Sequence, residues 1–124
     1  MRSGEQNRTD KESNEEKRVF SRVPCLVDLE VVGAETPAAP VEAVDLSLLG
    51  VGFTLKRPET KVEIGQQVEI AMHGLRTVRG QVRWNQGGRV GVQFRGRFQD
   101  IVDSWVGEVL AAQGVRLGDL VKVE

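Results

Sequence analysis

Apolar side chains recur at every second position from residue 23 onward, and this alternation restricts the fold more than any other feature of the chain. The first run contains Cys25, Val27, Leu29 and Val31. Further runs of the same kind follow at residues 41–47, 49–55, 68–72, 78–84 and 90–94. A period of two with many β-branched residues is typical of strands that bury one face. About six such strands, separated by turns, predict a mainly β fold, a small barrel or sandwich.

The segments between these runs are rich in turn-forming residues. Residues 33–40, with the sequence GAETPAAP, and residues 56–65 are predicted to be loops. The Asn-Gln-Gly-Gly sequence at residues 85–88 predicts a hairpin between two strands. Gly50 and Gly52 fall on the same face of one predicted strand. Two glycines on one face indicate a bulge, or another group that approaches the backbone closely.

The period changes near the C-terminus. Apolar residues recur there at intervals of three and four, as Phe98, Ile101, Val102, Trp105, Val109 and Ala112. This spacing predicts one α-helix over residues 98–113, ended by Gly114, that covers one mouth or face of the sheet. The weak alternation in residues 115–124 fits either a short strand or a loose tail, and both alternatives stay open.

Composition sets the broad class of the protein. The chain has 124 residues, 40% of them hydrophobic, and a net charge of −1, so one soluble domain without an overall basic field is expected. Residues 1–17 contain no large apolar side chain after Met1 and are predicted to be a flexible tail, with a frayed charged helix as the alternative. The folded domain is expected over residues 18–113, followed by a C-terminal tail at residues 114–124. No apolar run reaches the roughly 20 residues of a membrane helix, and no signal peptide is recognisable, so a cytoplasmic location is expected.

Two polar groups of residues do not fit a packing requirement. Arg18 and Arg22 lie four positions apart at the border of the predicted tail. Asp45, Ser47 and Gly50 interrupt an otherwise apolar run. Together they suggest a site for a compact anion that also carries hydrogen-bonding bases. The competing interpretation is structural: exposed arginines in solvent, and an Asp and a Ser that cap a turn through local backbone hydrogen bonds.

The order of these motifs along the chain resembles the PilZ family. The resemblance rests on the RxxxR box at residues 18–22, the DxSxxG box at 45–50, the GxVxW segment at 80–84 and the GVxF segment at 91–94. It covers nearly all of the predicted folded part. It implies a six-stranded antiparallel β-barrel with a C-terminal α-helix, and a cytoplasmic bacterial receptor for the second messenger cyclic di-GMP that regulates motility or biofilm formation.

The resemblance also implies which residues bind the ligand. The motif residues are Arg18, Arg22, Asp45, Ser47 and Gly50, and Lys17 and Trp84 are further candidates. An arginine fork suits a phosphate or the O6/N7 edge of guanine, and its flat face can stack on a base. A carboxylate can accept hydrogen bonds from the N1 and N2 donors of guanine. A lysine, with one compact charge, would serve these purposes poorly.

A mechanism follows from the position of the RxxxR box beside the predicted tail. The tail is expected to order over the bound nucleotide and to create a surface that an unidentified effector protein reads in trans. One or two nucleotides per site, and a monomer or a weak homodimer, all remain open. His73 has no neighbour at ligand spacing, Cys25 is expected to be buried, and no catalytic set is recognisable. The protein is therefore expected to be no enzyme and to need no metal or cofactor.

Two other functions compete with this one. The chain could be a PilZ-like interaction module, for example in pilus or flagellar motility, that does not bind the nucleotide. A barrel that binds single-stranded nucleic acid would need a basic groove with several exposed aromatics. Only 5% of the residues are aromatic, and most of these fall on predicted core faces, so no nucleic acid polymer is expected as a partner.

Overall fold

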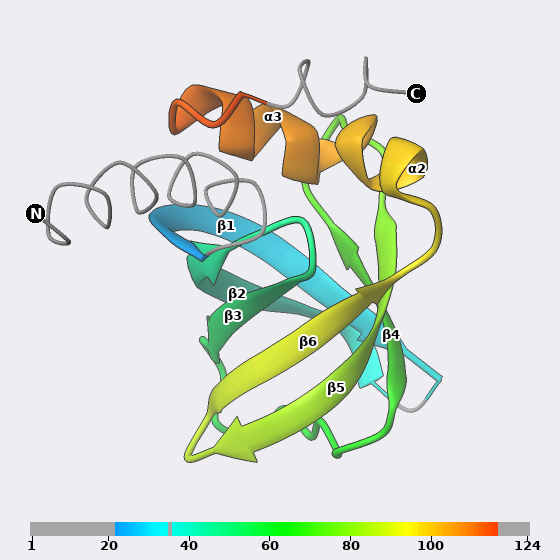
Figure 1. Ribbon diagram of the computed structural model, residues 1–124. Helices are drawn as coiled ribbons and strands as arrows, with labels where there is room; N and C mark the ends of the chain where they lie inside the picture. Colours follow the sequence, from blue (N-terminus) through cyan, green and yellow to red (C-terminus); the bar gives the residue numbers. More distant parts are fainter. Residues whose placement is uncertain (1–21, 35, 117–124) are drawn as a thin grey trace, which may run out of the picture.

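The computed structural model describes residues 22–34 and 36–116, which form a closed antiparallel barrel (Figure 1). The strands are β1 (Val23–Gly33), β2 (Thr36–Leu46), β3 (Gly50–Leu55), β4 (Gln67–Ala71), β5 (Val78–Gln86) and β6 (Arg89–Arg95). They follow one another around the barrel in the order β1-β2-β3-β6-β5-β4, with β4 pairing back onto β1. The predicted fold class, a six-stranded antiparallel barrel with C-terminal helical structure, is confirmed.

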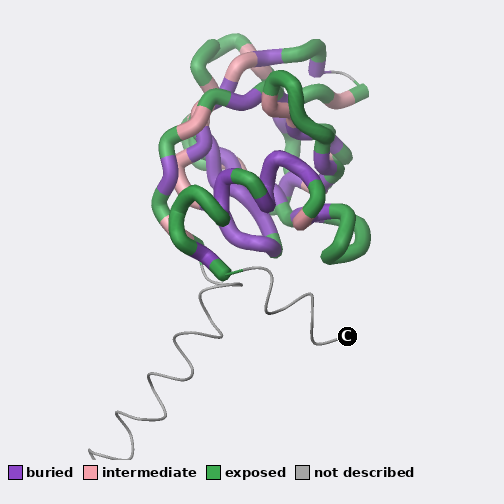
Figure 2. Tube along the Cα trace, turned by 90° about the horizontal axis from the view of Figure 1, so that it is seen from above, coloured by how far each residue is buried: buried purple, intermediate pink, exposed green. Residues whose placement is uncertain are grey.

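The inward side chains of all six strands form the core. Figure 2 shows buried and exposed positions alternating around the ring of strands. The fully buried strand residues include Val31, Val41, Leu46, Val51, Phe53, Ile70, Val82 and Val90. The helices α2 (Phe98–Val102) and α3 (Trp105–Ala112) lie across one mouth of the barrel (Figure 1). Trp105 anchors them, because its Nε1 donates to the carbonyl of Ile70 at 2.9 Å and its ring meets Phe94 edge-on.

The loop predicted at residues 33–40 is wrong over most of its length, because β2 begins at Thr36. The two prolines suggested a break, since proline lacks the N–H that a strand donates. In this segment β2 pairs only with β1, and its pairing with β3 begins at Val41. A proline on a stretch with one neighbouring strand loses nothing when its missing N–H faces the unpaired side.

The single helix predicted over residues 98–113 is also wrong, because α2 and α3 are separate. Ser104 lies between them in extended conformation and caps α3, accepting a hydrogen bond from the N–H of Val106 at 3.1 Å. Its hydroxyl donates to the carbonyl of Ile101 at 2.6 Å. The two helices approach so closely that a Cβ on Gly107 would overlap with the carbonyl oxygen of Val102. Gly114 has a φ of 88° and ends α3 as predicted.

The other mouth is covered by the long connection between β3 and β4. Thr36 and Val62 are buried there, and the Oγ1 of Thr36 donates to the carbonyl of Lys61 at 2.8 Å. Asn85 donates from its side chain to the carbonyl of Val62 at 2.9 Å. The predicted flexible tail at residues 1–17 lies outside the described residues, as do residues 117–124. Among the residues described, no helix has the length and apolar character needed to span a membrane.

Candidate functional site

Two β-bulges decide which side chains face outward on one side of the barrel. The pairing of β2 with β3 shifts between Ala43 and Asp45, which makes Val44 an extra residue. A second shift, in the pairing of β5 with β6, lies immediately before Trp84. Because side chains alternate along a strand, one inserted residue reverses the direction of those that follow. Asp45 and Trp84 therefore face outward, while Leu46 is turned into the core.

Four residues form a row across the outer surface of β2, β3, β6 and β5. Asp45 pairs with Gly52, Gly52 with Gly91, and Gly91 with Trp84. A Cβ on Gly52 would lie 2.9 Å from Oδ1 of Asp45, and a Cβ on Gly91 would overlap with the indole of Trp84. Each flanking side chain thus lies directly over its neighbouring glycine. The row offers a carboxylate at one end and an aromatic ring at the other, each lying over a glycine that leaves room for it.

The carboxylate of Asp45 lies between two arginines. Nη1 of Arg22 donates to Oδ1 at 2.5 Å, and Nη2 of Arg89 lies 3.6 Å from Oδ2. The side chains of Arg22 and Arg89 are 44% and 54% exposed, and that of Asp45 is 26% exposed. Ion pairs with this exposure contribute about 0–1 kcal/mol to stability. Both guanidinium groups can therefore leave the carboxylate for an incoming anion at little cost.

Ser47 and Gly50 build the turn that joins β2 to β3. The Oγ of Ser47 accepts a hydrogen bond from the N–H of Leu49 at 3.0 Å, and the N–H of Ser47 donates to the carbonyl of Gly50 at 2.9 Å. Ser47 is only 2% exposed. Gly50 is required for packing, because a Cβ there would overlap with the carbonyl oxygen of Val92 on β6. The close approach predicted for Gly50 and Gly52 is thus confirmed, with different neighbours at the two positions.

Cys25 lies in the core behind this surface. Burial raises the pKa of its thiol above the ordinary 9.0, and the negative charge of Asp45 raises it further. The thiol is therefore protonated at neutral pH and is a poor nucleophile. Within residues 22–34 and 36–116, no three His, Cys, Asp or Glu side chains gather in a way that could hold a metal ion.

The sequence matches the PilZ domain family over residues 16–104, which is most of the chain. The chain belongs to the PilZ family. Its barrel is similar to the crystal structure of the PilZ domain of CeSA from a cellulose-synthesizing bacterium, with a TM-score of 0.58 and 18% sequence identity. That similarity covers 74% of this chain and 97% of the CeSA chain, and at this identity it shows the fold alone. No curated protein sequence matches the chain.

The structure brings some of the residues of the PilZ motifs close together, as predicted, but not all of them. Arg22 of the RxxxR box contacts Asp45 of the DxSxxG box, and Trp84 lies in the same outward row. Ser47 and Gly50 lie at the turn beside them but are buried. Arg18 and Lys17, the remaining candidates, lie outside the described residues.

Three residues of this PilZ surface were absent from the predicted site. Arg89 was not singled out in the sequence, because its distance from Asp45 depends on the pairing of β2 with β3 and of β3 with β6. Gly52 and Gly91 could have been suspected from the sequence, because each is a glycine at an outward-facing position of a predicted strand. What the sequence did not indicate is that the two pair with each other and carry Asp45 and Trp84 on either side.

Proposed function

We propose that this PilZ domain is a non-enzymatic receptor for cyclic di-GMP that passes the signal to an effector protein in trans. PilZ domains generally bind this nucleotide, and the family membership supports the proposal. The observation that carries it for this chain is the outward row of Asp45, Gly52, Gly91 and Trp84, with Arg22 already in contact with its acidic end.

The chemistry of the row suits a guanine base. The two glycines leave room for the carboxylate of Asp45 and the indole of Trp84 to lie against the sheet, and the exposed indole offers an aromatic surface for stacking. Asp45 can accept hydrogen bonds from the N1 and N2 donors of guanine, which an adenine edge does not present. Arg22 and Arg89 provide forked donors for the phosphates or for the O6/N7 edge.

Nucleotide binding in this arrangement is an exchange of partners. The guanidinium of Arg22 leaves the carboxylate for a phosphate, and Asp45 becomes free to accept from the base. Arg18 supplies the second fork of the RxxxR box, and Lys17 adds charge next to it. Ser47 and Gly50 keep the turn in the shape that presents Asp45. The segment that carries the two arginines closes over the ligand and forms the surface that the effector reads.

Isothermal titration calorimetry with cyclic di-GMP tests the proposal. We expect the wild type to bind, Arg18→Ala and Arg22→Ala to lose binding, and Asp45→Ala and Ser47→Ala to weaken it. Arg57→Ala is a matched control, because Arg57 is exposed in the connection between β3 and β4, away from the row. A folded wild type that ignores the nucleotide would favour the interaction module without a ligand. The fitted stoichiometry distinguishes one bound nucleotide from two.

Two further measurements separate parts of the mechanism. Cyclic di-AMP should bind much more weakly than cyclic di-GMP, and Asp45→Asn should reduce this discrimination because the amide adds donors where the guanine donates. Amide exchange of residues 12–24, with and without nucleotide, tests the closure of the arginine segment. Unchanged protection would reject closure while leaving nucleotide binding itself intact.

A further inference from the structure

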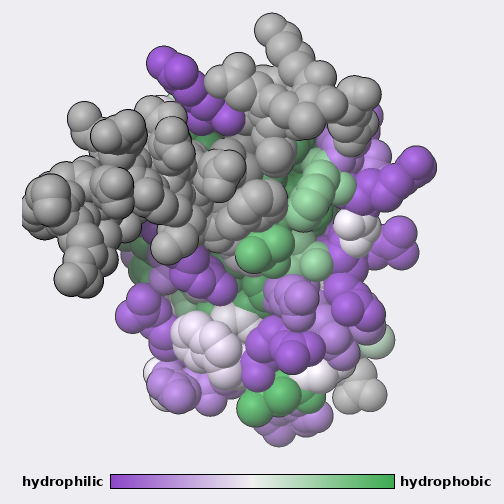
Figure 3. All heavy atoms as spheres, viewed as in Figure 1, coloured by the Kyte–Doolittle hydropathy of each residue, from purple (hydrophilic) through white to green (hydrophobic). Residues whose placement is uncertain are grey.

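The charges of the chain are distributed unevenly along the sequence. Residues 70–99 contain six arginines and no lysine, aspartate or glutamate, although the whole chain carries −1. All six are exposed: Arg76, Arg79, Arg83, Arg89, Arg95 and Arg97. This stretch forms β5, β6 and the segments that adjoin them. Figure 3 shows hydrophilic side chains gathered over the β5–β6 hairpin, so this face of the barrel is both polar and basic.

Two of these arginines face each other at the end of the hairpin near the helices. Arg79 pairs with Arg95 in the register of β5 and β6. Like charges at directly opposite positions of a sheet repel each other. Within residues 22–34 and 36–116, neither guanidinium lies within ion-pair distance of a carboxylate. Arg79 also pairs with Glu69 on β4, whereas Arg95 has no acid opposite it in the register of β5 and β6. An external anion at Arg95 would therefore relieve the repulsion between the two arginines.

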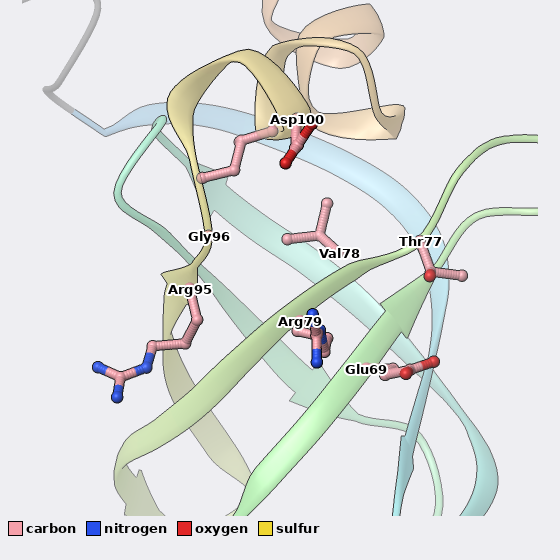
Figure 4. Close-up of a pocket in the computed structure, with 8 residues that line it drawn as sticks. Glu69, Thr77, Val78, Arg79, Arg95, Gly96 and Asp100 are labelled. Carbon is pink, nitrogen blue, oxygen red and sulfur yellow. The ribbon is translucent and has the colours of Figure 1, made fainter.

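A hollow of about 190 Å³ lies next to this pair, between the sheet and α2. Its apolar surface comes from Val78 and Ile101, which are 5% and 3% exposed. Figure 4 shows Asp100 pointing from α2 towards the hollow, with Glu69 on the opposite side. The surface thus combines the guanidinium groups of Arg79 and Arg95, a small apolar hollow and two carboxylates.

We propose that the helix end of the β5–β6 surface, around Arg79, Arg95 and the hollow, binds an acidic segment of a partner protein. Carboxylates of the segment bind Arg79 and Arg95, and an apolar side chain beside them enters the hollow. A nucleic acid or an anionic membrane would present phosphates throughout and would bring some of them against Glu69 and Asp100. A protein segment can place its acids over the arginines alone, so the mixed charges of this surface favour a protein.

This surface is separate from the candidate nucleotide site. Arg79 and Arg95 pair at the helix end of the hairpin, whereas Arg89, which reaches Asp45, lies beside the hairpin turn. The proposal therefore does not depend on nucleotide binding.

The test uses the full chain and a defined probe, a peptide in which one leucine is flanked on both sides by glutamates. Nuclear magnetic resonance titration should shift signals of Val78, Arg79, Arg95 and Ile101. Fluorescence anisotropy should show binding on the order of tenfold weaker for Arg79→Glu/Arg95→Glu. The double variant Arg57→Glu/Arg116→Glu changes the net charge equally at exposed positions elsewhere, and it should bind nearly as the wild type does.

A counterpart peptide with glycine in place of leucine tests the hollow. We expect it to bind several-fold more weakly and to leave the Val78 and Ile101 methyl signals unshifted. Equal losses in the two double variants would overturn the proposal, because the peptide would then respond only to net charge. Equal binding of the two peptides would remove the role of the hollow. Tighter binding of single-stranded oligonucleotides or phosphatidylserine vesicles through Arg79 and Arg95 would overturn it in favour of those partners.

Discussion

Replacing Gly52 by alanine should separate the stability of the barrel from the proposed binding of cyclic di-GMP. The added methyl group would lie 2.9 Å and 3.0 Å from the two carboxylate oxygens of Asp45, so Asp45 must move. The oxygens belong to a partly exposed side chain that can rotate outward. We therefore expect Gly52→Ala to change the site more than the fold.

The expected changes in stability and in affinity follow from the interactions that the free protein and the complex each lose. In the free protein the displaced carboxylate weakens exposed ion pairs worth about 0–1 kcal/mol. Alanine offsets this, because it loses roughly 0.5–1 kcal/mol less conformational freedom on folding than glycine. In the complex the displacement removes hydrogen bonds between a charged acceptor and guanine, worth about 1.5–3 kcal/mol. Stability should thus stay within about 1 kcal/mol, whereas Kd should rise roughly 10- to 150-fold.

Urea unfolding and calorimetric titration with cyclic di-GMP measure the two quantities. The double variant Gly52→Ala/Asp45→Ala should bind no worse than Asp45→Ala alone, because the glycine acts only through the carboxylate. Wild-type affinity in a folded Gly52→Ala protein would refute the assignment of Asp45 as the base acceptor. A further loss in the double variant would show that Gly52 contacts the ligand by another route.

Three other predictions concern the site and the core. Trp84→Ala should weaken cyclic di-GMP binding by about 1–3 kcal/mol if the indole stacks on a base, measured by calorimetry, whereas Trp84→Phe should retain most of the affinity. Gly107→Ala should lower the free energy of unfolding by about 1–3 kcal/mol, because the methyl group meets the carbonyl of Val102; a stabilised variant would contradict this packing. Because the folded pKa of Cys25 is raised above 9.0, the fold favours the protonated thiol, and this contribution is full below pH 9 and is lost as the pH rises through the folded pKa. Wild type should therefore lose more stability than Cys25→Ala in alkaline urea titrations, and parallel curves would contradict the raised pKa.

The alternation of apolar residues was enough to predict about six strands with one buried face, because such a face imposes the same period on every strand. It left a barrel and a sandwich open, and the resemblance to the PilZ family decided for the barrel. The predicted boundaries of strands and helices were wrong where the local sequence favours one structure and the packing of the whole domain imposes another. Pro37 and Pro40 suggested a loop, but they lie where β2 has only one neighbouring strand. The helical stripe over residues 98–113 gave no sign that Ser104 would bond to Ile101 and start a new helix.

The candidate site was predictable where a motif lies on the chain itself, and not where strands must be paired first. Asp45 and Trp84 were named from their motifs, but their outward direction depends on bulges that are visible only in the pairing of neighbouring strands. Arg89 illustrates the same limit. It lies 44 positions from Asp45 in the sequence, and only the order β2-β3-β6 brings the two side chains within 3.6 Å.

The ion pair between Arg22 and Asp45 has a consequence for how salt affects the proposed complex. Before binding, the guanidinium of Arg22 is paired with the carboxylate of Asp45. The phosphates of the nucleotide must therefore compete with this carboxylate for Arg22. Added salt weakens the contacts of arginine with phosphate, but it also weakens the internal competitor. The two effects oppose each other, so affinity should fall less steeply with ionic strength than the number of arginines alone would suggest.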